Sequence, residues 1–311
     1  MQQANDPQSA TTASSSSSID FLKGVGWVLL FTALFLAVAF TTSVSGKAVS
    51  QTALGWLSPF VRGVIQIGGV LLLTWWMRVK LNKAAWAGLM LPRPQVGLLL
   101  LGSVCGAAAI LAVAGTEYLL GWLQVVRVSA DPYWGLPRVV VILLVLIPAL
   151  GTGLSEELAF RGYIFQTLGE RVPVWAAALL MGFMFALVHF SVSGFGISFI
   201  LSTVIGSVMF LAMRFATGSL WFPIGFHAMW DWTQTYLVGL SSTGRKNDPA
   251  LIQISQSGPS AWVGGGNALE FGLLYTSVAA LALILALAYG RYAGRTIPWT
   301  RRLAAEGQAQ A

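Results

Sequence analysis

Residues 139–161 read VVVILLVLIPALGTGLSEELAFR, a largely apolar run that ends in two adjacent glutamates, Glu156 and Glu157. A charge at the centre of a membrane helix costs roughly 3 kcal/mol, whereas each of the nine apolar residues 139–147 contributes only about 0.5 kcal/mol to insertion. The glutamates therefore need partners inside the protein. The sequence offers Arg161, His189, His227 and Asp231 as partners, and these two histidines are the only ones in the chain.

The amino-acid composition predicts a membrane protein. Hydrophobic residues make up 56% of the 311 residues, charged residues only 9%, and the mean hydropathy is +0.73. A soluble domain would have about a quarter of its residues charged. We expect an all-α polytopic membrane protein, an eight-transmembrane-helix bundle, because each crossing needs about 20 apolar residues. The eight predicted spans centre on residues 24–41, 58–78, 95–115, 136–158, 174–190, 197–216, 220–238 and 268–290.

The net charge of +7 reflects orientation rather than nucleic-acid binding, because the basic residues are scattered through short loops. With a cytoplasmic N-terminus, 12 of the 18 Lys and Arg residues fall on the inner side. The positive-inside rule then predicts that both termini are cytoplasmic.

The chain divides into three predicted regions. Residues 1–18 are rich in serine and poor in apolar residues, which predicts a disordered N-terminal tail. Residues 19–292 form the eight-helix transmembrane domain, and residues 293–311 form a basic cytoplasmic C-terminal tail. Within the domain, residues 239–267 are the longest loop, and we expect a flexible connector or a lid over a substrate entrance.

Two further stretches carry structural predictions. Gly102 and Gly106 stand four residues apart, a spacing that lets membrane helices approach closely. The basic linker from Arg78 to Pro94 is predicted to be cytoplasmic.

The two glutamates are predicted to have different roles. Glu157 and Arg161 are four residues apart and can form an ion pair on one helix face. Glu156 lies about 100° around the helix, where it can point into the bundle and act as a base. For Glu157 and Arg161 alone, a plain structural ion pair explains the pattern equally well.

The positions of Glu156 and His189 along the chain predict that the two side chains lie close together. Pro173 is suited to the first turn of a new helix and so marks a helical hairpin. Glu156 lies 16 residues before Val172 and His189 lies 17 residues after it, so both stand roughly 25 Å from the turn at a rise of 1.5 Å per residue. We expect the carboxylate and the imidazole to face each other.

The seventh predicted helix supplies a second histidine. His227 and Asp231 are four residues apart, so Asp231 can accept a hydrogen bond from His227. A histidine held in this way can donate a hydrogen bond to a developing negative charge. Two histidines and at least two carboxylates in a water-poor bundle can activate a water molecule for attack on a carbonyl.

Three motifs resemble those of the CAAX-protease and bacteriocin-processing (Abi) family of intramembrane endopeptidases. They are Glu156-Glu157-x-x-x-Arg161, Phe185-x-x-x-His189 and His227-x-x-x-Asp231, in the order of the family, and the resemblance covers about residues 86–238. It implies an eight-helix bundle that hydrolyses a peptide bond inside the membrane. It further implies that Glu156 and His189 activate water, His227 and Asp231 stabilise the oxyanion, and Glu157 and Arg161 hold the geometry. Asp231 stands where the prenyl-protein endopeptidases of this family have Asn, which leaves its role open.

The metal and the substrate are less determined. No cofactor is expected, and zinc is the alternative, because two histidines with carboxylates suit zinc although no H-E-x-x-H helix is present. The expected partners are a peptide or lipidated-peptide substrate and membrane lipid, with no nucleic acid; the oligomeric state is not predicted. The expected location is a bacterial plasma membrane. The alternative functions are a proton-coupled transporter and a non-catalytic peptide-binding immunity protein.

Overall fold

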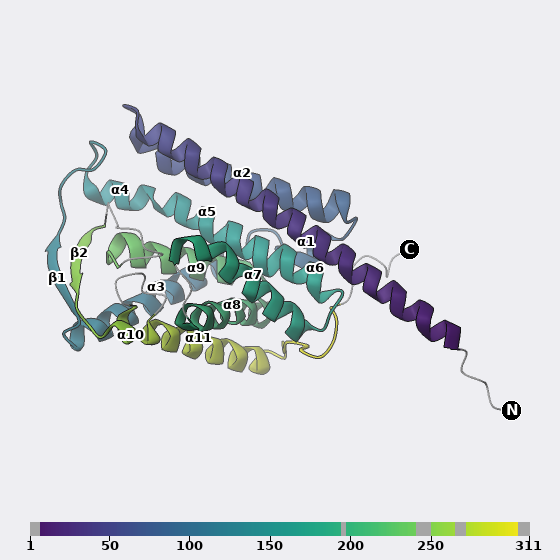
Figure 1. Ribbon diagram of the computed structural model, residues 1–311. Helices are drawn as coiled ribbons and strands as arrows, with labels where there is room; N and C mark the ends of the chain where they lie inside the picture. Colours follow the sequence, from purple (N-terminus) through teal and green to yellow (C-terminus); the bar gives the residue numbers. More distant parts are fainter. Residues whose placement is uncertain (1–6, 194–196, 241–249, 265–271, 304–311) are drawn as a thin grey trace.

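The computed structural model describes residues 7–193, 197–240, 250–264 and 272–303, and most of these residues are helical (Figure 1). Six helical segments in this part of the chain are long and apolar enough to cross a membrane: Ile19–Ser50, Gly55–Leu81, Val96–Leu119, Arg138–Gly169, Ser198–Thr217 and Leu273–Tyr292. The prediction of an all-helical membrane protein is therefore confirmed.

The number of eight helices is not confirmed. The predicted span 174–190 corresponds to a shorter apolar segment, Val174–His189. The predicted span 220–238 corresponds to α9 (Trp221–Trp232, 12 residues) followed by the π-helical turn η5 (Thr233–Leu237, 5 residues). The apolar stretch Val174–His189 and the α9–η5 stretch are each shorter than the roughly 20 residues of a typical crossing, although the helix that contains the first, α7 (Val174–Ser193), has 20 residues in all.

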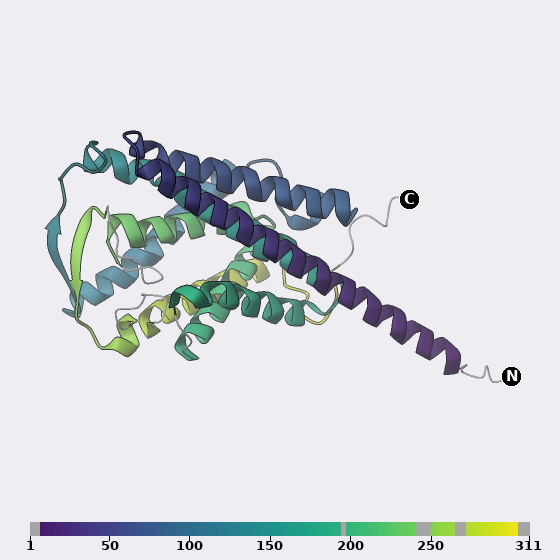
Figure 2. The same ribbon diagram turned by 45° about the horizontal axis from the view of Figure 1, so that its top comes forward.

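The first two long helices lie side by side along one side of the molecule (Figure 1, Figure 2). They are α1 (Pro7–Ser50) and α2 (Ser58–Trp75), joined through the short turn η1 (Gly55–Leu57). α1 begins at Pro7, within the stretch where the sequence predicts a disordered tail. Once an apolar helix has nucleated, each further residue adds a hydrogen bond, so a polar extension can continue it.

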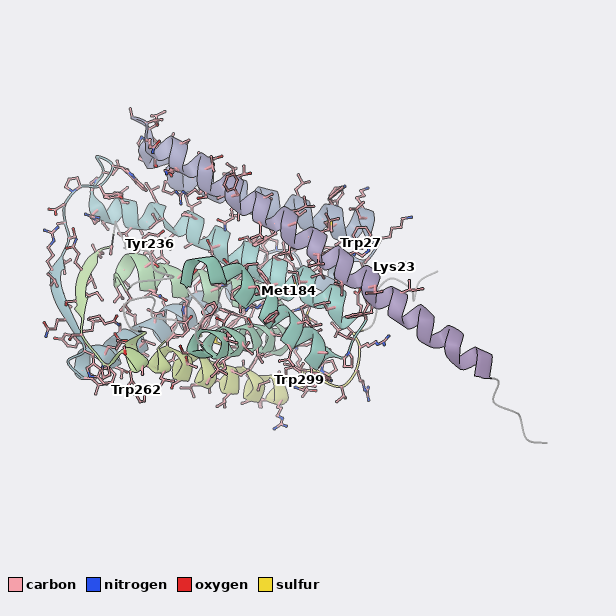
Figure 3. The ribbon with its side chains drawn as sticks, viewed as in Figure 1. Lys23, Trp27, Met184, Tyr236, Trp262 and Trp299 are labelled. Carbon is pink, nitrogen blue, oxygen red and sulfur yellow. The ribbon has the colours of Figure 1, made fainter. Side chains whose placement is uncertain are left out.

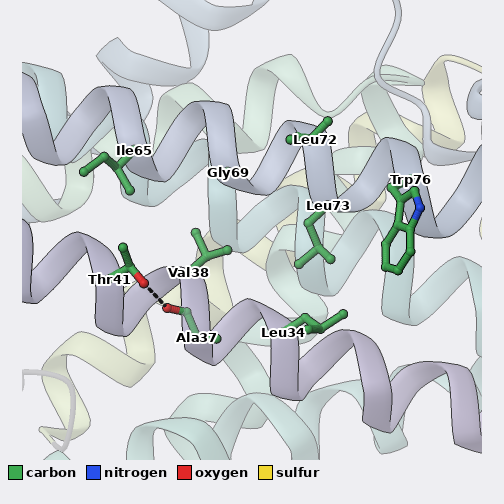
Figure 4. Close-up of a pocket in the computed structure, with 9 residues that line it drawn as sticks. All are labelled: Leu34, Ala37, Val38, Thr41, Ile65, Gly69, Leu72, Leu73 and Trp76. Carbon is green, nitrogen blue, oxygen red and sulfur yellow. Dashed lines mark hydrogen bonds between the residues drawn. The ribbon is translucent and has the colours of Figure 1, made fainter.

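A groove of 530 Å³ runs between α1 and α2 (Figure 4). Its lining is apolar except for Thr41, whose hydroxyl donates to the carbonyl of Ala37 (2.9 Å). None of the six predicted site residues lines this groove, so the candidate site lies elsewhere.

The central layer consists of one long interrupted helix and a helix packed closely against it. The long segment is built from α4 (Arg138–Leu144), α5 (Leu146–Glu156), the π-helix η4 (Glu157–Ile164) and α6 (Phe165–Gly169). α5 packs on α9, and α9 packs in turn on α3 (Val96–Leu119).

Glycines bring α3 and α9 into backbone contact, as their spacing predicts. A Cβ on Gly102 or Gly106 would overlap the carbonyl oxygens of Phe222 and Phe226 in α9, and one on Gly225 would overlap the carbonyl of Leu99 in α3. Such an approach is possible only without side chains, so these glycines fix the position of α9.

The remaining helices cover the other side of the site. α7 (Val174–Ser193) packs on α8 (Ile197–Thr217), and α8 packs on α11 (Leu273–Tyr292). The part of α1 around Lys23 and the end of α11 lie toward the same end of the bundle, and the first turns of α1 project beyond it (Figure 1, Figure 3).

A two-stranded antiparallel sheet lies at the opposite end of the bundle, near Trp262 (Figure 1, Figure 3). It pairs β1 (Leu123–Val128) with β2 (Ile252–Gln256), which is followed by the short helix α10 (Ser260–Val263). The prediction that residues 239–267 form a loop is therefore wrong for these parts; residues 241–249 and 265–267 lie outside the described chain. The pairing joins strands far apart in the sequence, so no local hairpin signal announces it.

The linker from Arg78 to Pro94 folds into the bundle instead of lying free in solvent. It contains the end of η2 (Trp76–Leu81) and the turn η3 (Trp86–Leu89), where the side chain of Leu89 is fully buried. The Met90 carbonyl accepts a hydrogen bond from the backbone N–H of Leu220 (2.8 Å). The linker is therefore part of the packed structure.

The described part of the predicted C-terminal tail, residues 293–303, also packs on the bundle. At the start of α7, the N–H groups of Val174 and Trp175 donate to the carbonyls of Arg301 and Trp299 (both 3.0 Å). The N–H of Leu303 donates to the carbonyl of Gly169 at the end of α6 (2.7 Å). Residues 299–303 thus supply hydrogen-bond partners for backbone groups at the end of α6 and the start of α7, which have no partner within their own helices.

Candidate functional site

The site forms where α5 meets α9, and a glycine permits the meeting. A Cβ on Gly153 would lie 2.7 Å from the carbonyl oxygen of Ile224 and 2.9 Å from the backbone nitrogen of Ala228. The two backbones are therefore nearly in contact one turn before Glu156, which ends α5, and beside His227 in α9. Small residues at this point bring the two glutamates within reach of His227.

Glu157, Arg161 and His227 form a buried ionic cluster. Arg161 Nη1 donates to Glu157 Oε1 at 3.0 Å, and His227 Nδ1 lies 2.8 Å from the same oxygen. The side chains of Glu157 and Arg161 are fully buried, and that of His227 is 9% exposed. Since a carboxylate accepts hydrogen bonds, Nδ1 of His227 carries the proton and Nε2 points away from Glu157.

Glu156 lies on the more open side of this cluster, between the two histidines. Its Oε2 is 3.8 Å from Nε2 of His189 and 3.8 Å from Nε2 of His227. The proximity of Glu156 and His189 predicted by counting through the hairpin is thus confirmed. The distances exceed a direct hydrogen bond and fall in the range that one water molecule can bridge.

The ring of His189 has a defined orientation. Its Nδ1 lies 2.9 Å from the carbonyl oxygen of Phe185, one turn earlier in α7. A carbonyl can only accept, so Nδ1 is the donor and the neutral ring presents the lone pair of Nε2 toward Glu156. The side chains of Glu156 and His189 are 18% and 26% exposed, so both can be reached from outside the buried cluster.

Asp231 is at the edge of the site. Its Oδ2 is 3.6 Å from His227 Nε2, and its side chain is 34% exposed. The i,i+4 spacing predicts a hydrogen bond between His227 and Asp231. In the structure, His227 makes its short contact with Glu157 instead. The close packing of α5 on α9 at Gly153 explains the difference, because it brings Glu157 to Nδ1 while Asp231 remains one turn away on the same helix.

Aromatic rings enclose the buried cation, and sequence reasoning identified only one of them. The Arg161 guanidinium lies over the ring of Phe185 at 4.6 Å and over that of Phe210 at 4.9 Å. Phe185 opens the F-x-x-x-H motif. Phe210, in α8, belongs to no motif, and nothing distinguishes it from the other 16 phenylalanines of the chain.

The histidines and carboxylates are also candidate metal ligands. Among the described residues, no group of three or more His, Cys, Asp and Glu side chains is arranged to hold a metal ion. The choice between a metal-free and a zinc mechanism stays a prediction.

Comparison with known protein families gives a match over part of the chain. Residues 138–233 match the family model described as Type II CAAX prenyl endopeptidase Rce1-like. This segment is similar to that family. No curated protein and no solved structure matches the chain.

The Rce1-like segment contains all six candidate residues, from Glu156 to Asp231. The resemblance that the three motifs indicate is thereby confirmed over this range, whereas residues 86–137 and 234–238 of the expected core lie outside the match. The apolar helices and the match together indicate an integral membrane protein in which residues 138–233 resemble a CAAX-protease-like peptidase.

Proposed function

We propose that this protein is an intramembrane endopeptidase in which Glu156 and His189 activate water for attack on a peptide bond. The observation that carries the proposal is the position of Glu156 Oε2, which lies 3.8 Å from Nε2 of each histidine on the accessible side of the cluster. The match to Rce1-like endopeptidases supports the same reaction class.

Burial separates the roles of the two glutamates. Glu157 is fully buried, and its Oε1 already accepts from Arg161 and His227, so it suits a positioning role. Among the residues that the structure describes, Glu156 makes no contact as short as these, and its side chain is 18% exposed, which leaves it accessible to water and substrate. A general base needs such access as well as geometry.

In the proposed reaction, water between Glu156 and His189 loses a proton to Glu156 while its oxygen attacks the scissile carbonyl carbon. The oxyanion forms near His227, whose imidazolium form would donate to it through Nε2. Glu156 then returns the proton to the leaving amine, the C–N bond breaks, and a carboxylic acid and an amine are released. Asp231 stays within 3.6 Å of His227 Nε2, where it can orient the ring.

The proposed substrate is a peptide in or at the membrane, and the family name favours one with a prenylated CAAX-type end. We further propose that the protein resides in a bacterial plasma membrane with both termini cytoplasmic. The start of α1 and the end of α11 lie toward the same end of the bundle, which supports the even number of crossings that this orientation requires (Figure 1).

The test is cleavage of fluorogenic CAAX peptides, prenylated and unprenylated, by purified protein in detergent. We expect Glu156→Gln, which keeps shape but cannot take a proton, to abolish turnover. Glu117→Gln is the matched control, because Glu117 is a fully buried glutamate outside the site, bonded to Gln256 (2.7 Å). Full activity of a folded Glu156→Gln protein would refute the proposal.

Two further measurements distinguish the metal-free protease from a zinc protease and from a proton-coupled carrier. Loss of cleavage with a chelator, restored by zinc, would replace the metal-free mechanism by a zinc mechanism. Proton uptake into proteoliposomes that Glu156→Gln abolishes, without any peptide cleavage, would identify a carrier instead.

A further inference from the structure

We infer that Phe210 is a positioning residue for the reaction, which fixes the ring plane of His227 and the guanidinium plane of Arg161 at the same time. The inference rests on the proposed function. It concerns a side chain on α8, a helix that contributes none of the six predicted site residues.

Phe210 contacts both partners of Glu157. Its ring stacks on the imidazole of His227, with centroids 4.8 Å apart and planes inclined by 23°. The same ring lies 4.9 Å from the guanidinium carbon of Arg161. Phe226 packs edge-on against it at 5.8 Å, and the side chain is only 8% exposed, so the ring itself has little freedom to move.

The imidazole needs this support because hydrogen bonding alone does not fix it. His227 makes its short contact through Nδ1, to Glu157 (2.8 Å), while Nε2 faces Glu156 and Asp231 at 3.8 and 3.6 Å. Rotation about the second side-chain torsion of histidine is broad and roughly two-fold. A flat ring stacked on one face restricts that rotation and keeps Nε2 directed at Glu156.

The guanidinium has the same requirement. Arg161 donates to Glu157 through Nη1, and within the described part of the chain its Nε and Nη2 have no hydrogen-bond partner. Its plane is held instead between the rings of Phe185 and Phe210. Planar stacking on aromatic faces is a property that suits arginine to such a position.

Phe215 provides a matched control on the same helix. It is 9% exposed, and its ring lies beneath a different buried cation, Arg214, at 5.7 Å. The substitutions Phe210→Leu and Phe215→Leu therefore remove an aromatic ring of similar burial beneath an arginine. They differ in that the first ring contacts His227.

The kinetic test compares these variants by kcat and KM for peptide cleavage. We expect Phe210→Leu to lower kcat about tenfold with little change in KM, since small misplacement of a reacting group costs up to about 100-fold. Phe210→Tyr, which keeps the ring, should restore kcat, and Phe215→Leu should stay near wild type. Equal losses in Phe210→Leu and Phe215→Leu, or no loss in Phe210→Leu, would overturn the inference. If Phe210→Leu does not fold, Phe210→Met replaces it, because an unbranched side chain fills the volume without a ring.

A second readout does not depend on turnover. The chain has only two histidines, so imidazole nitrogen NMR of the labelled protein yields two ring systems, which His189→Gln assigns. We expect a single set of ring-nitrogen signals for His227 in the wild type and in Phe215→Leu, and a shifted or averaged set in Phe210→Leu. An unchanged His227 signal in Phe210→Leu would refute the positioning role. A wild type that shows the single set of signals but cleaves no peptide would refute the proposed function alone.

Discussion

Replacing Arg161 by methionine should destabilise the protein strongly, because it leaves Glu157 charged and buried without its cation. Both side chains are fully buried, with Nη1 and Oε1 3.0 Å apart. Removing one partner of a buried ion pair costs about 3–5 kcal/mol in free energy of unfolding. His227 retains its contact with Glu157 at 2.8 Å, so we place the loss for Arg161→Met near the lower end, at about 3 kcal/mol.

The double variant Glu157→Gln with Arg161→Met should recover most of this loss. It removes both charges, and the amide oxygen of the new glutamine can still accept from Nδ1 of His227. We expect its stability to lie within about 1 kcal/mol of wild type, since replacing a whole buried pair by neutral groups is often neutral. Its catalytic activity should stay low, because the groups that orient His227 have changed.

The assay is reversible unfolding in mixed detergent micelles, analysed as a double-mutant cycle. The control is Arg127→Met, which breaks an exposed pair with Asp131 (2.6 Å, side chains 52% and 65% exposed) and should cost no more than about 1 kcal/mol. If Arg161→Met unfolds as readily as Arg127→Met, or if the double variant is as unstable as the two single changes added together, Glu157 and Arg161 do not compensate each other.

Two further predictions concern packing. Gly106→Ala should lower the free energy of unfolding by about 1–3 kcal/mol, because its Cβ would overlap the Phe226 carbonyl. Gly115→Ala, on the same helix, meets no atom within 4 Å and should be neutral or slightly stabilising. Equal stability of the two variants in thermal unfolding in detergent would contradict the packing argument. Arg78→Met should loosen the linker from Arg78 to Pro94, since the Arg78 side chain is 1% exposed and bonded to Glu170 at 2.6 Å. Limited trypsin digestion should then cut faster after Lys83. An unchanged rate would show that the ion pair does not hold the linker.

The sequence predicts the apolar helices and those contacts that follow from counting residues along the chain. The distances of Glu156 and His189 from the turn place them at one level, and the structure brings their polar atoms to 3.8 Å. The same reasoning misses the contact of His227 with Glu157. That contact depends on how closely two helices approach at Gly153, and a glycine in sequence does not show which backbone it faces.

Charge counting is the weaker part of the sequence reasoning. Arg78, Arg161 and Arg214 are among the 12 inner-side charges behind the predicted orientation, but all three are almost completely buried. Arg214 donates to the backbone carbonyls of Arg161 and Gly88, so it supports the interior of the bundle. A residue type that normally marks a loop can thus serve the core when its donors find partners, and only the tertiary structure reveals those partners.

The contact between residues 299–303 and the α6–α7 hairpin has a consequence for biosynthesis. The carbonyls of Trp299 and Arg301 that bond to the first turn of α7 lie in a segment that is translated after α7, α8, α9 and α11. The helix that carries His189 is therefore synthesised before these partners, and it acquires them only after α11 has been made. A nascent chain that has not yet reached residue 303 would hold the start of α7 less firmly than the folded protein does.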